Sequence, residues 1–460
     1  MSKKFLLAAA ALAVLGIAAS CNKVTPDPDP EPDPDPVVPE ETVSGNVSGV
    51  WEAGSTVRVD GHIVVPAGES LTIEEGVTVI FNENGVGVNH VPIEFTVDGN
   101  LYCLGSAANP VRLTVEESLR TVENTFEGLW GGIVASTSCE EMLIDHTIIE
   151  YTGGQVIEGS PAAQNNVYTA GDDAYPQITT NNIDGRYVIT NSIIRNGWSD
   201  GIYLMGGNAI IAGNTFAANG FDGAEAVNVK AGCKVDVAGN VMFSPNTNGL
   251  KLSSSGQSED RGQALVQAYN NTIINAGWRR DGEKGGGIYV EKNVFANVFN
   301  NLIVNCKFRA MTPSFSIPDD PEEGYDDDSV IDYNWYASGS QRSEIVFADE
   351  SGVAYAWEGY NYAHEDYNTG VVDAHSVIAT EDDGKDPLFV NFDINAVDLT
   401  GYEYDESWDF HLSADSPALE GAYSGNDDAM QPYFAASGLS VNGQTYNSPA
   451  VSSRYGAYGE

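Results

Sequence analysis

The chain has 460 residues, 42% of them hydrophobic, and its 66 Asp and Glu against 21 Lys and Arg give a formal net charge of −45. Because the sequence-independent affinity for nucleic acids comes from clustered Lys and Arg, this charge argues against a nucleic-acid partner. With 49 glycines and 10% aromatic residues, the composition predicts short strands and tight turns rather than a helical bundle.

Residues 1–20 have the features of a signal peptide. Lys3 and Lys4 precede an apolar stretch over residues 5–19, which is shorter than a membrane-spanning helix, and small residues lead to Cys21. This segment resembles the lipobox of bacterial lipoproteins. The resemblance implies that Cys21 is lipidated and that the chain contacts a membrane through this anchor alone. Secretion with an ordinary signal peptide is the alternative.

Residues 21–42 contain Cys21 and an acidic, proline-rich linker, in which Pro alternates with Asp or Glu over residues 26–36. Fixed proline dihedrals and repulsion between carboxylates keep such a segment extended. Acidic residues close to a lipidated Cys resemble the surface-export signals of Bacteroidetes lipoproteins. We therefore expect an outer-membrane lipoprotein at the cell surface, with a periplasm-facing anchor as the alternative.

From residue 43 onward the sequence consists of short runs rich in β-branched residues. The runs at 63–65, 71–73 and 77–81 are separated too closely for helices. An Asn then recurs after 23, 26, 31 and 30 residues, at Asn191, Asn214, Asn240, Asn271 and Asn301. Such a period with β-type units predicts a solenoid. We expect each of these Asn residues both to adopt the left-handed bend and to hydrogen-bond the Asn of the next coil.

A second Asn set lies four or five residues later, at Asn196, Asn219, Asn275 and Asn305. We expect it to form another ladder of stacked amides. Four further cysteines are widely spaced and form no C-x-x-C pair: Cys103, Cys139, Cys233 and Cys306. This spacing argues against zinc and redox motifs, and we expect buried core thiols.

Two groups of segments carry a resemblance to a known fold. Residues 65–77, 99–101 and 108–111 resemble the opening coils of right-handed parallel β-helix proteins. Near the other end, three segments resemble the closing part of pectate-lyase-like members, at residues 386–391, 409–412 and 416–419. The resemblance covers residues 43–421. It implies an all-β fold, a right-handed parallel β-helix that is a single-stranded solenoid with three strands per coil.

Three regions follow from this resemblance and from the charge distribution. We expect the main β-helix over residues 43–310 and irregular acidic terminal coils over residues 311–421. Residues 422–460 are expected to form a C-terminal cap, because an uncovered solenoid end exposes core and unpaired strand.

One face of the predicted solenoid gathers polar and aromatic side chains. Each coil carries a strand of three residues with apolar outer positions, so the middle residue is expected to face solvent. These middle residues are Val134, Tyr203, Asn228, Lys251 and Tyr289. Shortly before these strands, Asp200, Glu225 and Asn248 project to the same side. An insertion over residues 152–186 and a loop over 278–286 would wall a groove at this face.

The resemblance implies polysaccharide lyases, glycoside hydrolases or glycan-binding surface proteins, so the choice rests on residues. A lyase needs a base and a positive charge beside the uronate, which Lys251 with Arg279 and Arg280 could supply, while Glu225 or Asp200 could hold a metal. A hydrolase needs two carboxylates, and Asp200 and Glu225 on adjacent coils are the candidates.

Our leading hypothesis is a groove that binds a polysaccharide or surface glycan, and cleavage of that glycan by a lyase or glycosidase reaction is left open. Lys251, Glu225 and Asp200 are the candidate catalytic residues. The candidate substrate-binding residues are Trp198, Tyr203, Asn228, Trp278, Arg279, Arg280 and Tyr289. The abundant oxygen ligands make Ca²⁺ the one cofactor to consider, although the acidic runs at 326–328 and 381–384 lack EF-hand spacing. A non-enzymatic surface adhesion or structural protein is the alternative.

Overall fold

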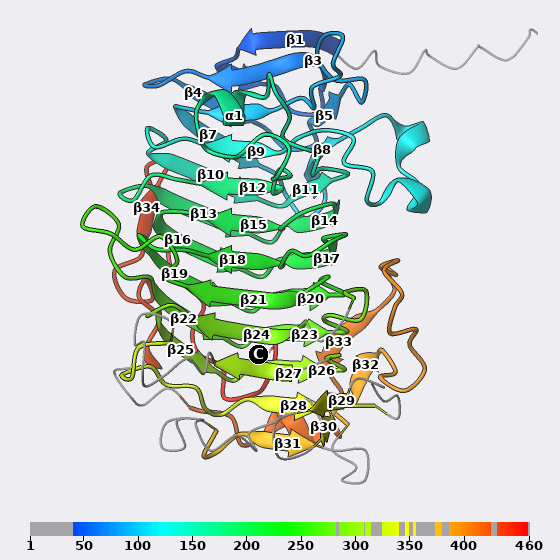
Figure 1. The fold of residues 1–460 in the computed structure, drawn as a ribbon, viewed down its shortest axis with the longest axis vertical. Helices are drawn as coiled ribbons and strands as arrows, with labels where there is room; N and C mark the ends of the chain where they lie inside the picture. The colour runs from blue at the N-terminus through cyan, green and yellow to red at the C-terminus, as the bar shows by residue number, and fades with distance from the viewer. Residues whose placement is uncertain are drawn as a thin grey trace, which may run out of the picture. The chain divides into compact units, whose positions relative to one another are not determined.

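The computed structural model describes residues 40–281, 285–307, 309–313, 324–339, 346–348, 353–355, 373–379, 386–424 and 430–458. The signal peptide, Cys21, the linker up to residue 39 and the acidic run 381–384 lie outside the described residues. From Val38 onward the chain forms one compact unit, in which the strands are wound into a coil of stacked turns (Figure 1). No helix of the described part is long and apolar enough to cross a membrane.

The strands form three columns of parallel neighbours. The site column contains β6 (Phe95–Val97), β9 (Ile133–Ala135), β12 (Ile178–Thr180), β15 (Ile202–Leu204), β18 (Val227–Val229), β21 (Asn248–Ser253), β24 (Gly286–Glu291) and β27 (Arg309–Pro313). The back column contains β2 (Gly49–Trp51), β4 (Ser70–Ile73), β7 (Asn100–Leu104), β10 (Glu141–Asp145), β13 (Arg186–Thr190), β16 (Gly207–Ala212), β19 (Cys233–Ala238), β22 (Leu265–Tyr269) and β25 (Phe295–Phe299).

The third, or side, column contains β1 (Glu40–Asn46), β3 (Thr56–Val65), β5 (Thr78–Phe81), β8 (Val111–Thr114), β11 (Thr147–Glu150), β14 (Ile193–Gly197), β17 (Thr215–Asn219), β20 (Val241–Phe243), β23 (Thr272–Ile274), β26 (Leu302–Val304), β28 (Trp335–Ala337) and β31 (Val377–Ala379). The long strand β3 also pairs with β6 and so joins the side column to the site column. A complete coil runs from the site column to the back column, then to the side column and on to the next coil. The prediction of a right-handed parallel β-helix with three strands per coil is confirmed.

The remaining elements among the described residues are short, and the counts below refer to this part of the chain. Three antiparallel hairpins pair β29 (Val346–Ala348) with β30 (Val353–Tyr355), β32 (Phe389–Asn391) with β33 (Asp409–Leu412) and β34 (Leu439–Val441) with β35 (Gln444–Tyr446). The helices are η1 (Glu117–Leu119), η2 (Val122–Asn124), α1 (Pro161–Gln164) and η4 (Pro417–Leu419). None of them interrupts the stacking of the coils.

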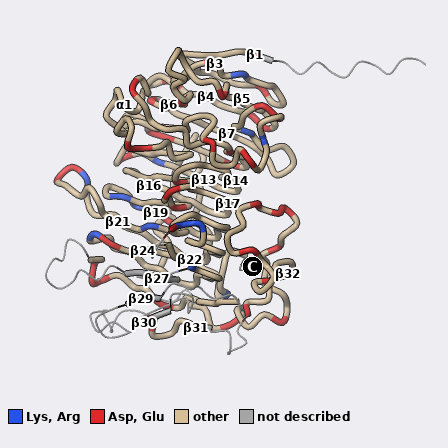
Figure 2. Tube along the Cα trace, turned by 45° about the vertical axis from the view of Figure 1, so that its right-hand side comes forward, with Lys and Arg blue, Asp and Glu red and all other residues tan. Residues whose placement is uncertain are grey.

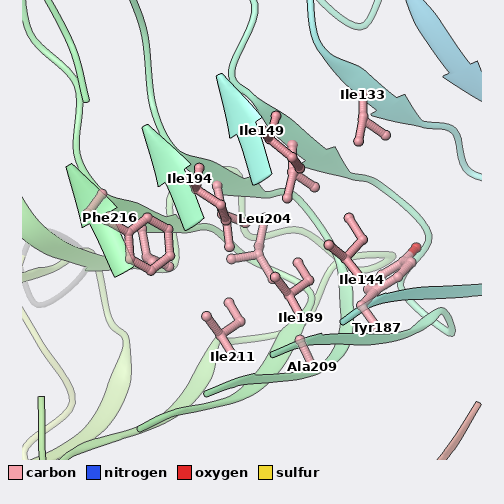
Figure 3. Packing of buried hydrophobic residues seen from close by; sticks show 14 of the residues in the cluster. Ile133, Ile144, Ile149, Tyr187, Ile189, Ile194, Leu204, Ala209, Ile211 and Phe216 are labelled. Atoms are coloured by element: carbon pink, nitrogen blue, oxygen red, sulfur yellow. The ribbon is translucent and has the colours of Figure 1, made fainter. Parts of the chain in front are cut away.

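The core fills the inside of the coil from all three columns. Side chains alternate across a strand, so the outer residues of each site-column triplet point inward, and Ile202 and Leu204 are fully buried. Figure 3 shows Leu204 meeting Ile194 of the side column and Ile189 of the back column. Since the same inward positions repeat on every coil, one apolar cluster runs from Val47 to Tyr336. The four cysteines at positions 103, 139, 233 and 306 are buried free thiols, as expected.

Glycine before a site-column strand has a steric cause. A Cβ on Gly201 would lie 2.6 Å from the carbonyl oxygen of Ala226 on the next coil. No side chain fits at position 201 without moving the backbone, whereas Ala226 and Gln177 occupy the equivalent position before β18 and β12.

The Asn ladder exists, but the bend and the stacked amide belong to two adjacent residues. The left-handed conformation occurs at Asn191, Gly213, Gly239, Asn270 and Asn300. The ladder is formed by the residue that follows each of them: Ser192, Asn214, Asn240, Asn271 and Asn301, continued by Asn334. Asn191 is therefore not a ladder residue, because Ser192 takes that position. The other four predicted ladder residues are confirmed.

Each ladder amide satisfies buried polar groups on both sides. Asn240 Nδ2 donates to Asn271 Oδ1 (2.9 Å) and to the carbonyl oxygen of Ile211 (3.0 Å). Asn240 Oδ1 in turn accepts from the backbone N–H and from Nδ2 of Asn214, at 3.0 Å each. An amide side chain suits this position because it can donate and accept at once.

The predicted second ladder is wrong. Asn196, Asn275 and Asn305 share the left-handed bend with Ala218 and Ser244, so this position selects for a bend and not for a stacked amide. Asn219 lies one residue later in register, opposite Gly197, and its Nδ2 donates to Gln177 Oε1 at 2.7 Å. Within the described residues, the buried amide of Asn275 has no hydrogen-bond partner.

Further segments lie on both sides of the main β-helix. The first strand starts at Glu40, and coils continue past residue 310, because β28 pairs with β26 and β31 pairs with β28. The segment 430–458, called the strap here, does not cover the solenoid end. It lies along the outside of the back column, where β34 (red in Figure 1) stands beside β13 and β16. The strap buries outward-facing apolar side chains of that column, including Leu143, Val188 and Ile210.

Candidate functional site

Strand register brings the candidate polar residues together on the site column. Ile202 of β15 pairs with Val227 of β18, so Asp200 and Glu225, each two residues earlier, are neighbours on adjacent coils. Leu250 of β21 pairs with Val227 and places Asn248 on the other side of Glu225. The same register stacks Tyr203, Asn228, Lys251 and Tyr289. The predicted alignment of these two rows is confirmed.

Asp200 and Glu225 form a hydrogen-bonded pair. Asp200 Oδ1 accepts the backbone N–H of Glu225 at 2.6 Å. Asn228 Nδ2 donates to Glu225 Oε2 at 3.1 Å and to Asp200 Oδ2 at 3.4 Å, and Asn248 Nδ2 donates to Glu225 Oε1 at 3.0 Å. The Asn228 amide therefore bridges the two carboxyl groups.

The environment of Asp200 and Glu225 favours the protonated form of Asp200. Burial raises the pKa of Asp200 well above its usual range, and the negative charge of Glu225 raises it further. The side chains are buried, with 7% of each residue exposed. Two carboxyl groups on adjacent coils disfavour ionisation of both, so these surroundings favour the protonated form of Asp200.

A pocket opens directly above the pair. Its volume is about 480 Å³, and Asp200 and Glu225 line it together with Tyr203, Trp198 and Tyr168. Trp198 comes from the turn before β15, and Tyr168 comes from the insertion that precedes β12. Aromatic side chains around a few convergent polar groups are typical of a ligand pocket.

The insertion that walls this pocket is anchored on a buried carboxylate that sequence reasoning missed. Glu94 accepts the backbone N–H of Ala162 at 2.7 Å, the hydroxyl of Tyr175 at 2.7 Å and the hydroxyl of Thr96 at 2.6 Å. Burial raises its pKa. The insertion also covers Val134, which is therefore buried. The prediction that the middle residues face solvent is thus wrong for Val134 and for Asn228, which is 5% exposed.

Two lysines stand beside the pair and differ in charge environment. Lys251 Nζ lies 3.4 Å from Glu291 Oε1. Burial alone would lower the pKa of Lys251, but the carboxylates of Glu225 and Glu291 outweigh it, so the pKa is raised. Lys230 follows β18 and lies over the Tyr203 ring at 5.3 Å. Burial and the charge of Lys251 lower its pKa.

The lysine environments bear on the predicted base. Lys251 is held protonated and ion-paired, which suits a binding cation and not a base. Lys230 is the lysine whose charged form is disfavoured. The sequence did not identify Lys230 as a site residue, because it follows the three-residue strand. Only residues within that strand and just before it recur from coil to coil.

The predicted substrate-binding residues divide into two groups. Trp198 and Tyr203 line the pocket, and Tyr289 lies under Lys251, with its ring 5.8 Å from Nζ. Trp278 donates from Nε1 to the carbonyl oxygen of Asn305 at 2.6 Å. Trp278 and Tyr289 are not among the residues lining the pocket.

The two arginines of the 278–286 loop are bound within the protein. Arg279 donates to the carbonyl oxygens of Gly220 and Ser244, at 2.6 Å each, and its guanidinium lies 4.7 Å from the Phe126 ring centre. Burial lowers its pKa to about 10. Arg280 pairs with Asp222 at the pocket rim. In this structure Arg279 therefore holds the turn in place and does not reach the pocket.

In the described ranges, no group of three or more His, Cys, Asp or Glu side chains is arranged so that it could hold a metal ion. Asp326 of the acidic run 326–328 accepts from Gln263 Nε2 at 2.6 Å. Ca²⁺ as a cofactor therefore stays a prediction of the sequence alone.

Comparison with family models gives one match. Residues 177–316 match the family described as "Right handed beta helix region", and this stretch contains Asp200, Glu225, Lys230 and Lys251. Comparisons with curated proteins and with solved structures found no match. The stacked parallel strands and this family match together identify the chain as a right-handed parallel β-helix protein.

Proposed function

We propose that the chain binds a polysaccharide in the pocket above Asp200 and cleaves it, with Asp200 as the proton donor. One observation carries this proposal: two buried carboxyl groups, bridged by the Asn228 amide, form part of a pocket that aromatic side chains line. A carboxyl group whose pKa is raised can hold its proton and donate it to the glycosidic oxygen as the bond breaks.

Proton donation to the leaving oxygen is needed both in hydrolysis and in elimination, so this role of Asp200 holds for either reaction. Glu225, on the adjacent coil, is the anionic partner that keeps the proton on Asp200. Tyr203 and Trp198 would stack on sugar rings, and Lys251 with Asn228 would contact hydroxyl or carboxylate oxygens.

A second candidate function is binding without cleavage. It is favoured by the hydrogen bonds that already satisfy Glu225, since Asn228 and Asn248 each donate to one of its oxygens. A carboxylate so fully bonded can act as a fixed acceptor in a binding surface. In both candidates we propose attachment to the outer membrane through Cys21, which rests on the lipobox resemblance.

The test uses Asp200→Asn in the full chain. Asparagine keeps an oxygen that accepts the Glu225 N–H but has no proton to donate, so cleavage is expected to slow about 10²–10⁴-fold. Activity is measured on a panel of neutral and uronic-acid polysaccharides, as new reducing ends for hydrolysis and as ultraviolet absorbance for elimination.

Asp184→Asn is the matched control, because Asp184 is exposed in the turn before β13 and lies outside the pocket. It should cleave like the parent chain. If the parent binds a polysaccharide of the panel but releases no product, the cleavage part is wrong and the binding function stands.

A further inference from the structure

A second pocket lies on the side column, away from the carboxyl pair. It has a volume of about 650 Å³ between Phe243 of β20 and the segment 391–408 that links β32 to β33. Four aromatic side chains line it: Phe243, Phe392, Tyr402 and Trp408. None of the sequence motifs singled out this region as a binding site.

The aromatic walls are held in place by packing and by hydrogen bonds. The Trp408 ring lies 4.7 Å from Phe243 and 5.2 Å from Phe392. Ile394 and Phe410, on either side of the segment, are buried against the side column. Asn391 Nδ2 donates to the carbonyl oxygen of Ser407 at 2.6 Å and joins the two ends of the segment. The pocket is therefore formed before any ligand arrives.

The charge around this pocket limits its ligand. Asp393, Asp398 and Glu403 line it and are exposed, and no Lys or Arg is among its lining residues in the described part of the chain. Carboxylates accept hydrogen bonds from hydroxyl groups and repel carboxylates and sulfates. Together with a net charge of −45, this excludes an anionic sugar and favours an uncharged one.

A row of aromatic rings joins this pocket to the first one. Tyr402 lies 5.0 Å from Phe126, Phe126 lies 5.8 Å from Phe221, and Phe221 stacks on Trp198 at 4.5 Å. Trp198 lines the pocket above Asp200. Phe221 is 52% exposed, so the row presents aromatic surface to solvent along its way.

We propose that the pocket of Phe243, Phe392, Tyr402 and Trp408 is a second sugar-binding site that holds an uncharged pyranose unit of a polysaccharide. The less polar face of the ring would stack on Phe392, Tyr402 and Trp408, while Phe243, 1% exposed, supports Trp408 from below, and the sugar hydroxyls would donate to the rim carboxylates. The aromatic row would guide the same polysaccharide toward the pocket above Asp200. This last step rests on the proposed function, whereas binding at the second pocket does not.

The experiment measures binding of soluble uncharged polysaccharides, a glucan, a mannan and a xylan, to the full chain carrying Asp200→Asn, by calorimetry and by retardation in native gels. Trp408→Phe keeps the packing and reduces the stacking surface, and Tyr402→Ala removes one wall. Each is expected to weaken binding of the recognised polysaccharide about three- to tenfold, the value of one aromatic contact. Glu403→Gln removes the negative charge of one rim carboxylate without changing the packing.

The control is Tyr446→Ala, a half-buried tyrosine of the strap outside both pockets, which should bind like the parent. A thermal melt of each variant confirms folding. The proposal is overturned if Tyr402→Ala and Trp408→Phe both bind as tightly as the parent, or if a polyuronate is the tighter ligand and loses affinity in the same variants. Failure of the cleavage proposal is separate, because every chain in this experiment carries Asp200→Asn and the comparison among them measures affinity, not turnover.

Discussion

At the scale of single residues, the proton on Asp200 is set by charges that can be removed one at a time. The positive charge of Lys230 lowers the pKa of Asp200, against the larger upward effects of burial and Glu225. Lys230→Met removes that charge, so the pKa of Asp200 rises further. If Asp200 donates a proton in the reaction, activity is lost when it ionises. The alkaline limb of the pH–activity profile is therefore expected to move to higher pH in Lys230→Met.

Lys234→Met is the control for this shift. Lys234 lies only four residues on, but it belongs to β19 of the back column and stands over Tyr433 of the strap. Its profile should match that of the parent chain. An alkaline limb that stays in place in Lys230→Met, or moves to lower pH, would mean that another group controls it.

The pairing of Asp200 with Glu225 could be predicted from the sequence, because strand register follows from the repeat. Arg279 shows the limit of that reasoning. An arginine in a loop beside a predicted groove suggests a ligand contact. The Arg279 guanidinium instead donates hydrogen bonds to the carbonyl oxygens of Gly220 and Ser244. The backbone path of a turn decides which of its carbonyl oxygens still lack a hydrogen-bond donor. Amino-acid composition does not specify that path.

At the scale of elements, the Asn ladder is expected to hold the coils together. Asn240→Ala would remove the acceptor of the Asn214 N–H and of Asn214 Nδ2, and a donor to the Ile211 carbonyl, in a fully buried turn. Each buried polar group that loses its partner costs roughly 1–3 kcal/mol. The free energy of unfolding of the variant should therefore fall by about 2–5 kcal/mol. Urea unfolding followed by circular dichroism measures the effect as a lower midpoint.

Asn191→Gly tests the neighbouring bend position. Glycine occupies this position at 213 and 239, and the Asn191 side chain is exposed. The free energy of unfolding of this variant should change by no more than about 0.5 kcal/mol, so its urea midpoint should change little. Equal losses in the two variants would contradict the proposed role of the stacked amide, because Asn191→Gly keeps both the bend and the ladder.

The confusion between bend and ladder has a physical cause. Asn tolerates the left-handed conformation and also stacks well, so a recurring Asn fits both roles. Only the pairs Gly213-Asn214 and Gly239-Asn240, where glycine takes the bend, separate them. Those pairs are visible in the sequence, and they place the ladder on the second residue of each pair.

At the scale of the whole molecule, the strap decides which surfaces of the solenoid are free. Leu143, Val188 and Ile210 point outward from the back column and are buried by the strap. Strands buried on both faces read as continuous apolar runs, and residues 142–144 and 187–189 are such runs. The signal for a lateral cover was therefore present. What covers it could not be predicted, because the strap has no repeat that fixes its register.

A buried carboxylate, Asp236, is one of the groups that fasten the strap to the back column. Asp236 of β19 accepts the backbone N–H groups of Tyr433 (3.0 Å) and Phe434 (2.9 Å) and the hydroxyl of Ser448 (2.6 Å). Burial raises its pKa to about 6, although these bonds oppose the shift. Acidic residues are spread over coils and loops (Figure 2), so the contribution of Asp236 must be isolated by comparison with a variant.

The raised pKa of Asp236 predicts a direction for stability against pH. An unfolded Asp titrates near pH 3.9, so between about pH 4 and pH 6 the folded chain keeps a proton that the unfolded chain releases. The Asp236 contribution to stability is therefore greatest below pH 4, falls as the pH rises to about 6 and is constant above. Asp236→Asn cannot titrate and lacks this slope. Melting temperatures of both chains are measured from pH 4 to pH 8, and the parent should lose stability relative to Asp236→Asn up to pH 6. A relative gain over that range would mean that the ionised carboxylate fastens the strap more tightly than the protonated one.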